Sequence, residues 1–284
     1  MSKTISLDCP AKVNLSLDVV KRRPDGYHNL ETIMHTVNLC DKLTLTMEEC
    51  DKVSATLHTN NSFIPANDDN LCIKAAKAFF AATGKTAKIT IDLEKNIPVG
   101  AGLGGGSSDA AGTLVGLNKL FGEPLTEAEL CKIAATLGAD VPFFIQGGCT
   151  LATGIGEILS PLPKLNNVVF VIAKPDYGIS TPYVYKNLVL DQNTKHPDTK
   201  AVIDAIEKND IHALGKEAMN VLETVVEKEH PEIPQYKTIM KNMGAAYSLM
   251  SGSGSSVFGV FDDLTLAQKC AEKLKELTNQ VFIA

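Results

Sequence analysis

Alternating apolar and polar residues mark the first third of the chain. Residues 87–93 read Ala-Lys-Ile-Thr-Ile-Asp-Leu, which has the period of two expected for a strand with one solvated face. Asp41 and Lys42 separate two such runs, and we interpret them as a tight turn. Comparable patterns predict further strands at residues 5–8, 12–20, 31–39, 42–48 and 53–58.

Three helices are predicted next. One begins at Asp68-Asp69-Asn70 and ends at Gly84, a residue type that commonly ends helices. A capping box at residues 126–129 begins another, which ends at Gly138. The third starts at a glycine-rich run and ends near residues 122–124.

The second half of the chain has a different order of elements. Two short strands precede the sequence Ser-Pro-Leu-Pro at residues 160–163, which we interpret as a boundary between domains 1–160 and 161–284. The later order allows a split βαβ sheet with helices on one face, so the predicted class is α+β. The predicted strands lie at 148–153, 156–159, 168–173, 246–250, 256–261 and 279–283, and the helices within 181–242 and at 265–277.

Composition narrows the class of protein. With 284 residues, 44% of them hydrophobic, the chain can bury a substantial core. A net charge of −6 with dispersed basic residues argues against a nucleic-acid partner. The first residues lack the apolar core of a signal peptide, and no run approaches the roughly 20 apolar residues of a membrane span. We therefore expect a cytoplasmic protein with no membrane partner.

Cysteine and histidine spacing supports this view. The seven cysteines are odd in number and include no C-x-x-C pair, which suits reduced thiols in the cytoplasm. The six histidines show no metal-ligand spacing, so we expect no zinc site.

The most informative segment is the glycine-rich run KNIPVGAGLGGGSSDAA at residues 95–111. Residues without Cβ let the chain approach an anion closely. A loop of this kind at a helix start also directs backbone N–H groups and the positive end of the helix dipole at oxyanions. The segment therefore predicts a phosphate-binding loop.

Other interpretations of this run are weaker. Residues 100–105 satisfy the G-x-G-x-x-G pattern of NAD-binding oxidoreductases, but about ninety residues precede them and Pro98 breaks a direct strand-to-turn connection. The Gly-Lys-Ser/Thr sequence of a Walker A loop is absent here. A flexible linker would be polar throughout, whereas this run continues into an apolar-periodic helix.

Four segments together resemble the GHMP kinase superfamily, which includes galactokinase, homoserine kinase and mevalonate kinase. They are PAKVNLSLDV at 10–19, the glycine loop at 98–109, GADVPFF at 138–144 and SGSGSSVF at 251–258. RPDGYHNL at 23–30 and the triple glycine at 104–106 resemble the branch that acts on a cytidine diphosphate ester of methylerythritol. The resemblance implies an N-terminal ribosomal-protein-S5-like domain and a C-terminal ferredoxin-like domain that completes the substrate cleft.

The resemblance also implies an activity. It is phosphoryl transfer from ATP, with Mg²⁺, to the 2-hydroxyl of that ester, a step of the non-mevalonate isoprenoid precursor pathway. Asp140 matches the base that accepts the hydroxyl proton, and Lys12 matches the cation that keeps the carboxylate ionised and attracts the phosphoryl oxygens. No protein ligand for the metal is assigned.

Binding residues are assigned by the same match. Tyr27 and Tyr185 offer flat faces for stacking the cytosine, and His28 offers hydrogen bonds to the base edge. The substrate set is Asn14, Tyr27, His28, Asp140, Tyr185, Gly252 and Ser253. The nucleotide set, with Asn70 and Lys95 at the adenine, is Asn70, Lys95, Pro98, Gly100, Gly102, Leu103, Gly104, Gly105, Gly106, Ser107 and Ser108.

Plainer interpretations remain open from the residues alone. Lys12 suits a solvated strand face, Asp140 a helix-end capping or turn residue, and tyrosines such as Tyr27 and Tyr185 are most often packing residues. The stacking residues argue against a GHMP kinase for a sugar, homoserine or mevalonate, because those substrates have no base to stack. The intact Lys12 and Asp140 argue against a catalytically inactive member that only binds ligand. We expect a monomer or a weak homodimer.

Overall fold

The computed structural model describes residues 2–284, which divide into two compact units. Unit 1 holds the described residues up to Ala11 together with Cys40–Ile97 and Gly104–Gly147. Unit 2 holds Lys12–Leu39, Pro98–Leu103 and Gly148–Ala284. The two long strands, β1 (Ser2–Arg22) and β2 (His28–Glu48), contribute residues to both units. The predicted boundary at residue 160 stays a prediction.

Strand β2 corrects the predicted turn at Asp41 and Lys42. The strand continues through both residues, and Lys42 pairs with Glu94 in the antiparallel register of β2 and β4 (Lys88–Glu94). Asp41 is buried, with its carboxylate hydrogen-bonded inside unit 1. Two adjacent charged residues between apolar runs look like a turn in the sequence. The partners that bury Asp41 lie more than fifty residues away, so the local pattern does not reveal them.

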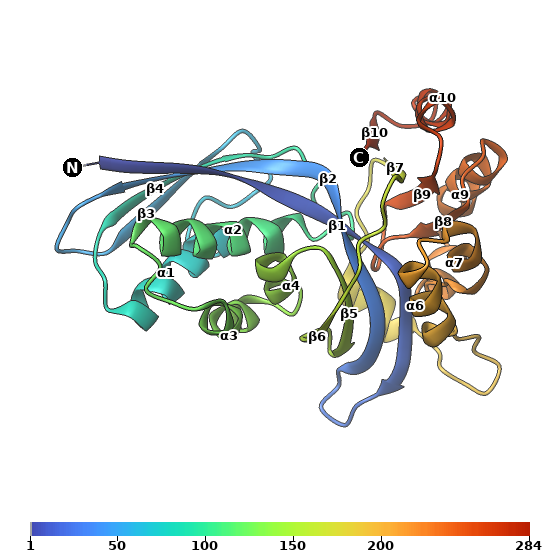
Figure 1. Cartoon of the computed structure of the whole chain (residues 1–284), viewed down its shortest axis with the longest axis horizontal. Coiled ribbons are helices and arrows are strands. Elements are labelled where there is room, and N and C mark those ends of the chain that lie inside the picture. The colour runs from blue at the N-terminus through green and yellow to red at the C-terminus, as the bar shows by residue number, and fades with distance from the viewer. Residues whose placement is uncertain (1) are drawn as a thin grey trace. The chain divides into compact units, whose positions relative to one another are not determined.

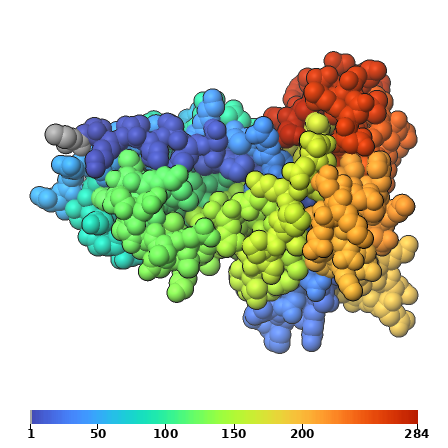
Figure 2. All heavy atoms as spheres, viewed as in Figure 1, coloured from blue at the N-terminus to red at the C-terminus, as the bar shows by residue number. Residues whose placement is uncertain are grey.

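Unit 1 is a sheet with helices on one face (Figure 1). Strand β3 (Ser54–Thr59) runs parallel to β4 (Lys88–Glu94) across the connecting helix α1 (Leu71–Thr83), and β2 pairs antiparallel with β4. The space-filling view shows the atoms of α2 and α3 (green) closing over this face (Figure 2). The other helices are α2 (Gly105–Leu120), α3 (Glu127–Leu137) and α4 (Val141–Gln146).

The predicted helix boundaries of unit 1 are confirmed by their caps. Asn70 caps α1 by accepting from the Cys72 N–H at 2.8 Å, and Gly84 ends that helix in a left-handed conformation. Thr126 and Glu129 form the predicted capping box of α3. These caps depend on neighbouring residues only, which is why the sequence reveals them.

Unit 2 contains an antiparallel sheet of strand order β10-β7-β9-β8. Helices α9 (Glu232–Asn242) and α10 (Leu264–Leu274) share a core with this sheet, which confirms the α+β class and the split βαβ arrangement. Strand β5 (Cys149–Gly154) pairs with β2 and with β6 (Ile158–Leu162). The sheet strands are β7 (Val169–Lys174), β8 (Tyr247–Met250), β9 (Val257–Phe261) and β10 (Gln280–Ile283), and the remaining helices are α5 (Thr181–Asn187), α6 (Thr199–Glu207), α7 (Ile211–Glu217) and α8 (Glu223–Val226).

Within residues 2–284, no helix is both long and apolar enough to cross a membrane.

Candidate functional site

Strand β1 carries two polar side chains into the interior of unit 2. Lys12 and Asn14 are two residues apart, so they project from the same face of the strand, and both are buried. The Lys12 ammonium donates to Asn14 Oδ1 at 2.5 Å, and Asn14 Nδ2 donates to Thr32 Oγ1 at 2.7 Å. Burial excludes the view of Lys12 as a solvated surface lysine, because an ammonium group is rarely buried without a specific use.

Two glycine loops meet beside these residues. We define the first glycine loop as residues 98–108 and the second as residues 251–256. A Cβ at Gly102 would lie 2.1 Å from the Ser251 carbonyl oxygen, and the Ser251 hydroxyl donates to the Gly102 carbonyl at 2.9 Å. The Lys12 N–H donates to the Leu103 carbonyl at 2.9 Å, which ties the first loop to β1. Glycine at 102 is required for this approach of the two backbones.

The second glycine loop is held by a side chain that the sequence did not reveal. Asn220 is buried, and its Nδ2 donates to the carbonyls of Met250 at 2.7 Å and Gly252 at 2.8 Å. Its neighbour Val221 donates its N–H to the Leu17 carbonyl of β1 at 3.0 Å. No motif surrounds Asn220, so only the fold shows its part in placing Gly252 and Ser253.

The structure brings the predicted substrate residues His28 and Tyr185 together in unit 2 and links the helix of Tyr185 to Ser253. The rings of His28 and Tyr185 lie 5.3 Å apart between centroids at 34°. Tyr27 exposes 61% of its surface, as an aromatic face open to a ligand requires. Thr181, on the same helix as Tyr185, has its hydroxyl oxygen 2.7 Å from that of Ser253. Burial, and to a lesser extent the charge of Arg22, lowers the pKa of His28, which favours the neutral imidazole.

The start of helix α2 in unit 1 has the features of an anion site. Gly104 precedes the helix in a left-handed conformation with a φ of 72°; no side chain caps the helix, and no acidic side chain lies in its first turn. Ser107 follows Gly105 and Gly106 in this first turn. The Ser108 hydroxyl is buried and has no hydrogen-bond partner within the described residues. Backbone N–H groups and a buried hydroxyl of this kind suit phosphate oxygens.

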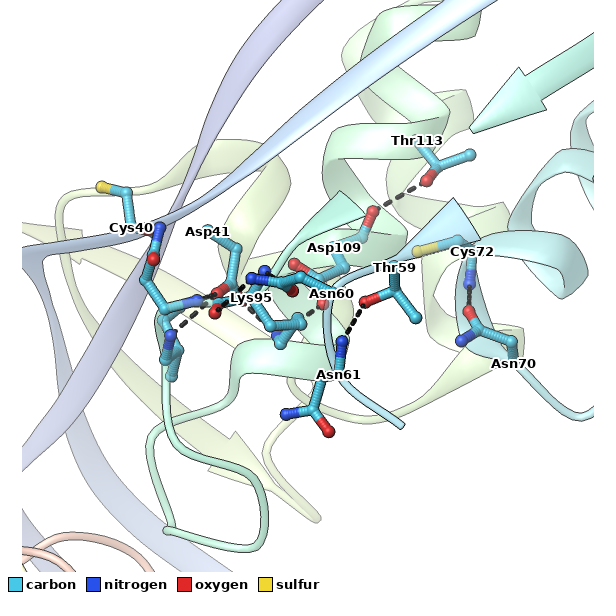
Figure 3. A network of polar contacts seen from close by, with 12 residues as sticks. Cys40, Asp41, Thr59, Asn60, Asn61, Asn70, Cys72, Lys95, Asp109 and Thr113 are labelled. Atoms are coloured by element: carbon cyan, nitrogen blue, oxygen red, sulfur yellow. Dashed lines mark hydrogen bonds and ion pairs between the residues drawn. The ribbon is translucent and has the colours of Figure 1, made fainter. Parts of the chain in front are cut away.

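Asn70 and Lys95 use their polar groups within unit 1. Asn70 Nδ2 donates to the Pro65 carbonyl at 2.8 Å while its oxygen caps α1. The Lys95 ammonium lies between the carboxylates of Asp41 and Asp109 (Figure 3). The contact of Asn70 and Lys95 with an adenine stays a prediction. Because their polar side-chain atoms are already bonded within unit 1, the backbone and apolar atoms of these residues are the ones left to contact the base. Sequence reasoning missed Asp41 and Asp109 as partners of Lys95.

Asp140 precedes helix α4 in unit 1. It occupies the N-cap position, yet its side chain makes no capping hydrogen bond. Asp140 lies within a turn that the backbone closes, since the Val141 N–H donates to the Gly138 carbonyl at 3.2 Å. The capping role considered for Asp140 is not supported, whereas its place in a helix-end turn is observed, and its catalytic role stays a prediction. In the part of the chain that the structure describes, no three His, Cys, Asp or Glu residues are grouped to hold a metal ion.

Comparison with known proteins decides the family. The descriptions "GHMP kinases N terminal domain" and "GHMP kinases C terminal" match residues 70–148 and 202–280. A protein of Lachnoclostridium phytofermentans named 4-diphosphocytidyl-2-C-methyl-D-erythritol kinase is 46% identical over 95% of this chain and 90% of its own. The chain belongs to this family of GHMP kinases. It is a small-molecule kinase, and ATP is the phosphoryl donor of GHMP kinases.

Further relatives agree with this family assignment. A Clostridium novyi protein of the same name is 43% identical over 96% of both chains. A crystal structure of 4-(cytidine 5'-diphospho)-2C-methyl-D-erythritol kinase has a TM-score of 0.82 and 35% identity over 98% of both chains. Homoserine kinase from Cytophaga hutchinsonii shares the fold, with a TM-score of 0.79 at 20% identity over 99% of this chain and 94% of that one.

Proposed function

We propose that this GHMP kinase transfers the γ-phosphoryl group of ATP to the 2-hydroxyl of 4-diphosphocytidyl-2-C-methyl-D-erythritol, a step of the non-mevalonate isoprenoid precursor pathway. The observation that carries the proposal is the grouping of the buried Lys12 and Asn14 with the second glycine loop in a unit that also pairs His28 with Tyr185. We expect the enzyme to act in the cytoplasm, as a monomer or weak homodimer.

The start of α2 supports binding of the ATP phosphates. Its uncapped N–H groups, the open backbone of residues 104–106 and the unpartnered Ser108 hydroxyl fit a polyanion. Mg²⁺ typically takes oxygens from substrate phosphates and water, so it can enter with the nucleotide and neutralise phosphate charge. We therefore propose ATP and Mg²⁺ as the cofactors, with no protein ligand assigned to the metal.

Asp140 and Lys12 are the proposed catalytic residues. In phosphoryl transfer the protein mainly positions both substrates and stabilises charge, so one base and one cation are the minimum. Asp140 accepts the proton of the attacking hydroxyl, and the Lys12 ammonium attracts the transferring phosphoryl oxygens. Asn14 orients Lys12 through their 2.5 Å hydrogen bond.

A coupled assay of ADP release tests the activity and the catalytic pair together. The cytidylated substrate should be turned over in preference to homoserine, galactose and mevalonate. Asp140→Asn and Lys12→Met should each lower kcat at least about a hundredfold, the scale usual for a general base, while ADP still binds. Turnover near that of the wild type in either variant would contradict the mechanism.

The cytosine site is tested by removing one ring at a time. Base–aromatic stacking is worth about 1–3 kcal/mol, so Tyr27→Ala and Tyr185→Ala should raise KM for the cytidylated substrate roughly 5- to 150-fold. Tyr185→Phe should be nearly silent. Tyr183→Ala is the matched control, since Tyr183 lies on the same helix with its hydroxyl bonded to Glu229. If neither Tyr27→Ala nor Tyr185→Ala changed KM, the cytosine of the substrate would have to bind at another site.

A further inference from the structure

Three buried charges lie beside the first glycine loop. We refer to Asp41, Lys95 and Asp109 as the charge brace (Figure 3). Their side chains are at most 3% exposed, and the Lys95 ammonium bonds to Asp41 Oδ2 and, at 2.7 Å, to Asp109 Oδ2. Burying ions costs desolvation energy that often cancels their attraction, so stability alone is a weak reason for this arrangement.

The brace joins the two segments between which the loop runs. Asp41 Oδ1 accepts the N–H groups of Asn96 at 2.6 Å and Ile97 at 2.8 Å, immediately before Pro98. Asp109 belongs to α2 and follows Ser108 directly. One residue of strand β2 therefore fixes the chain before the loop, and through Lys95 it fixes the helix after the loop.

Gly105 makes room for the brace. A Cβ at this position would lie 3.2 Å from Lys95 Nζ and 3.1 Å from Ile97 Cγ2, closer than ordinary contacts. The absence of a side chain at the first residue of α2 therefore lets the ammonium reach Asp109. This explains one glycine of the triple-glycine run by an internal contact, separately from its predicted contact with phosphate.

We propose that Asp41, Lys95 and Asp109 are positioning residues for the nucleotide, holding the start of α2 and the ends of the first glycine loop in the geometry that binds the phosphates. The proposal rests on the proposed function, because it takes this loop as the ATP site. Asp109 Oδ1 and Ser108 Oγ, side by side in the chain, are buried without a hydrogen-bond partner within residues 2–284. Buried polar atoms normally have partners, and a phosphate provides one for Ser108.

The charge of the brace depends on pH. Burial raises the pKa of Asp109 to about 7, with Lys95 opposing and Asp41 adding to the rise. Burial lowers the pKa of Lys95, but Asp109 and Asp41 outweigh it and the net direction is upward. The neighbouring thiols stay neutral, because burial raises the pKa of Cys9 and raises that of Cys72 to about 12. An anion bound nearby disfavours the ionised carboxylate, so nucleotide binding draws a proton to Asp109.

Calorimetric titration of the full chain with ADP tests the brace without using the acceptor. Lys95→Met should weaken ADP binding about 10- to 100-fold, because it leaves the two buried carboxylates of the charge brace without their cation and releases the start of α2. KM for the acceptor should change less than about twofold. Lys237→Met is the matched control, because Lys237 also bonds to two carboxylates, Glu223 and Glu227, but lies in unit 2. Its ADP affinity should match the wild type.

A second measurement separates positioning from a merely structural role. Asp109→Asn keeps the shape of the side chain and removes its titration. On binding ADP at pH 7, the wild type should bind as much as about half a proton more than this variant does. Calorimetric titrations in buffers of different ionisation enthalpy measure this proton uptake. The ligand's own protonation cancels in the comparison. Equal proton uptake in the two proteins, together with wild-type ADP affinity in Asp109→Asn, would overturn the proposal.

Gly105→Ala provides a variant that keeps all three charges if Lys95→Met does not fold. Its methyl group should displace the Lys95 ammonium and weaken ADP binding about tenfold or more, because the contacts of that methyl group are too short. Wild-type ADP affinity in a folded Lys95→Met or Gly105→Ala variant would defeat the brace proposal and leave the kinase function standing. A wild-type protein that fails to bind ADP would defeat both.

Discussion

The two glycine loops of this kinase are held in place by different chemistry. Charged groups fix the ends of the first loop, where Asp41 and Lys95 link the preceding chain to Asp109 of α2. An uncharged amide, that of Asn220, holds the Gly252 carbonyl of the second loop and the Met250 carbonyl just before that loop. The loop proposed to hold a polyanion thus depends on groups whose charge can respond to that anion. The carbonyls that Asn220 holds accept from an amide that does not titrate, and beside them the Met250 N–H donates to the carboxylate of Glu223, at Oε1, at 2.6 Å.

The largest expected effect comes from breaking the contact between the loops. Gly102→Ala places a methyl group 2.1 Å from the Ser251 carbonyl and strains a φ of +73°. The free energy of unfolding should fall by about 2–5 kcal/mol, from overpacking and left-handed strain together. Chemical denaturation measures it. Gly84→Ala is the control, since its φ is +65° with no atom within 4 Å of the added Cβ, so it reports the strain alone. Equal losses in the two variants would show that the loops do not interlock.

The next effect concerns the second loop by itself. Asn220→Ala leaves the carbonyls of Met250 and Gly252 without their donor. The free energy of unfolding should fall by about 2–4 kcal/mol, because each buried unsatisfied group costs about 1–3 kcal/mol. KM for the acceptor should rise while ADP affinity stays the same. Asn187→Ala, which removes an exposed amide bond to the Tyr183 carbonyl, should cost less than about 0.5 kcal/mol. A comparable loss of ADP affinity in Asn220→Ala would show that the second loop also serves nucleotide binding, and would contradict the separate roles proposed for the two loops.

The most gradual effect is the pH dependence of the first loop, because it is spread over about three pH units. The pKa of Asp109 is raised from 3.8 to about 7, so the folded chain keeps a proton there that the unfolded chain has released. This stabilisation is complete below about pH 4 and is lost as the pH rises through about 7. The free energy of unfolding of the wild type relative to Asp109→Asn should therefore fall with rising pH, by up to about 1.4 kcal/mol per unit.

Denaturation series between pH 4 and pH 8 provide this measurement. The difference between the wild type and Asn220→Ala should stay constant over the same range, because an amide does not titrate there. A flat difference for Asp109→Asn would mean that the carboxylate is already ionised throughout, and the contrast between the two loops would lose its electrostatic part.

The helix ends show how far local sequence reaches. Asn70, Gly84 and the capping box at Thr126 were predicted and confirmed, because each depends on residues within one turn. The alternation at residues 87–93 predicted β4 within one residue. Helices pack on one face of this strand, so buried and more exposed side chains alternate along it. Asp41 was misplaced because its partners, Lys95, Asn96 and Ile97, are more than fifty residues away in the sequence.

The candidate site divides in the same way. Sequence motifs pointed to Lys12, Asn14, the first glycine loop and Asp140, since each belongs to a compact pattern of residue types. They gave no sign of Asn220, which has no motif around it and acts on carbonyls about thirty residues later. They also gave no sign that Gly105 admits an ammonium group, because that depends on where β2 and β4 bring Asp41 and Lys95.

The sequence by itself determined the family, the α+β class and the segments that carry the proposed chemistry. It could do so because glycine runs, helix caps and strand alternation depend only on residues that are close together in the sequence. The tertiary structure decided which side chains hold those segments in place. Buried charges and amides become favourable only when the fold supplies their partners and removes water, and those partners come from distant parts of the chain. The charge brace and Asn220 are products of that second step.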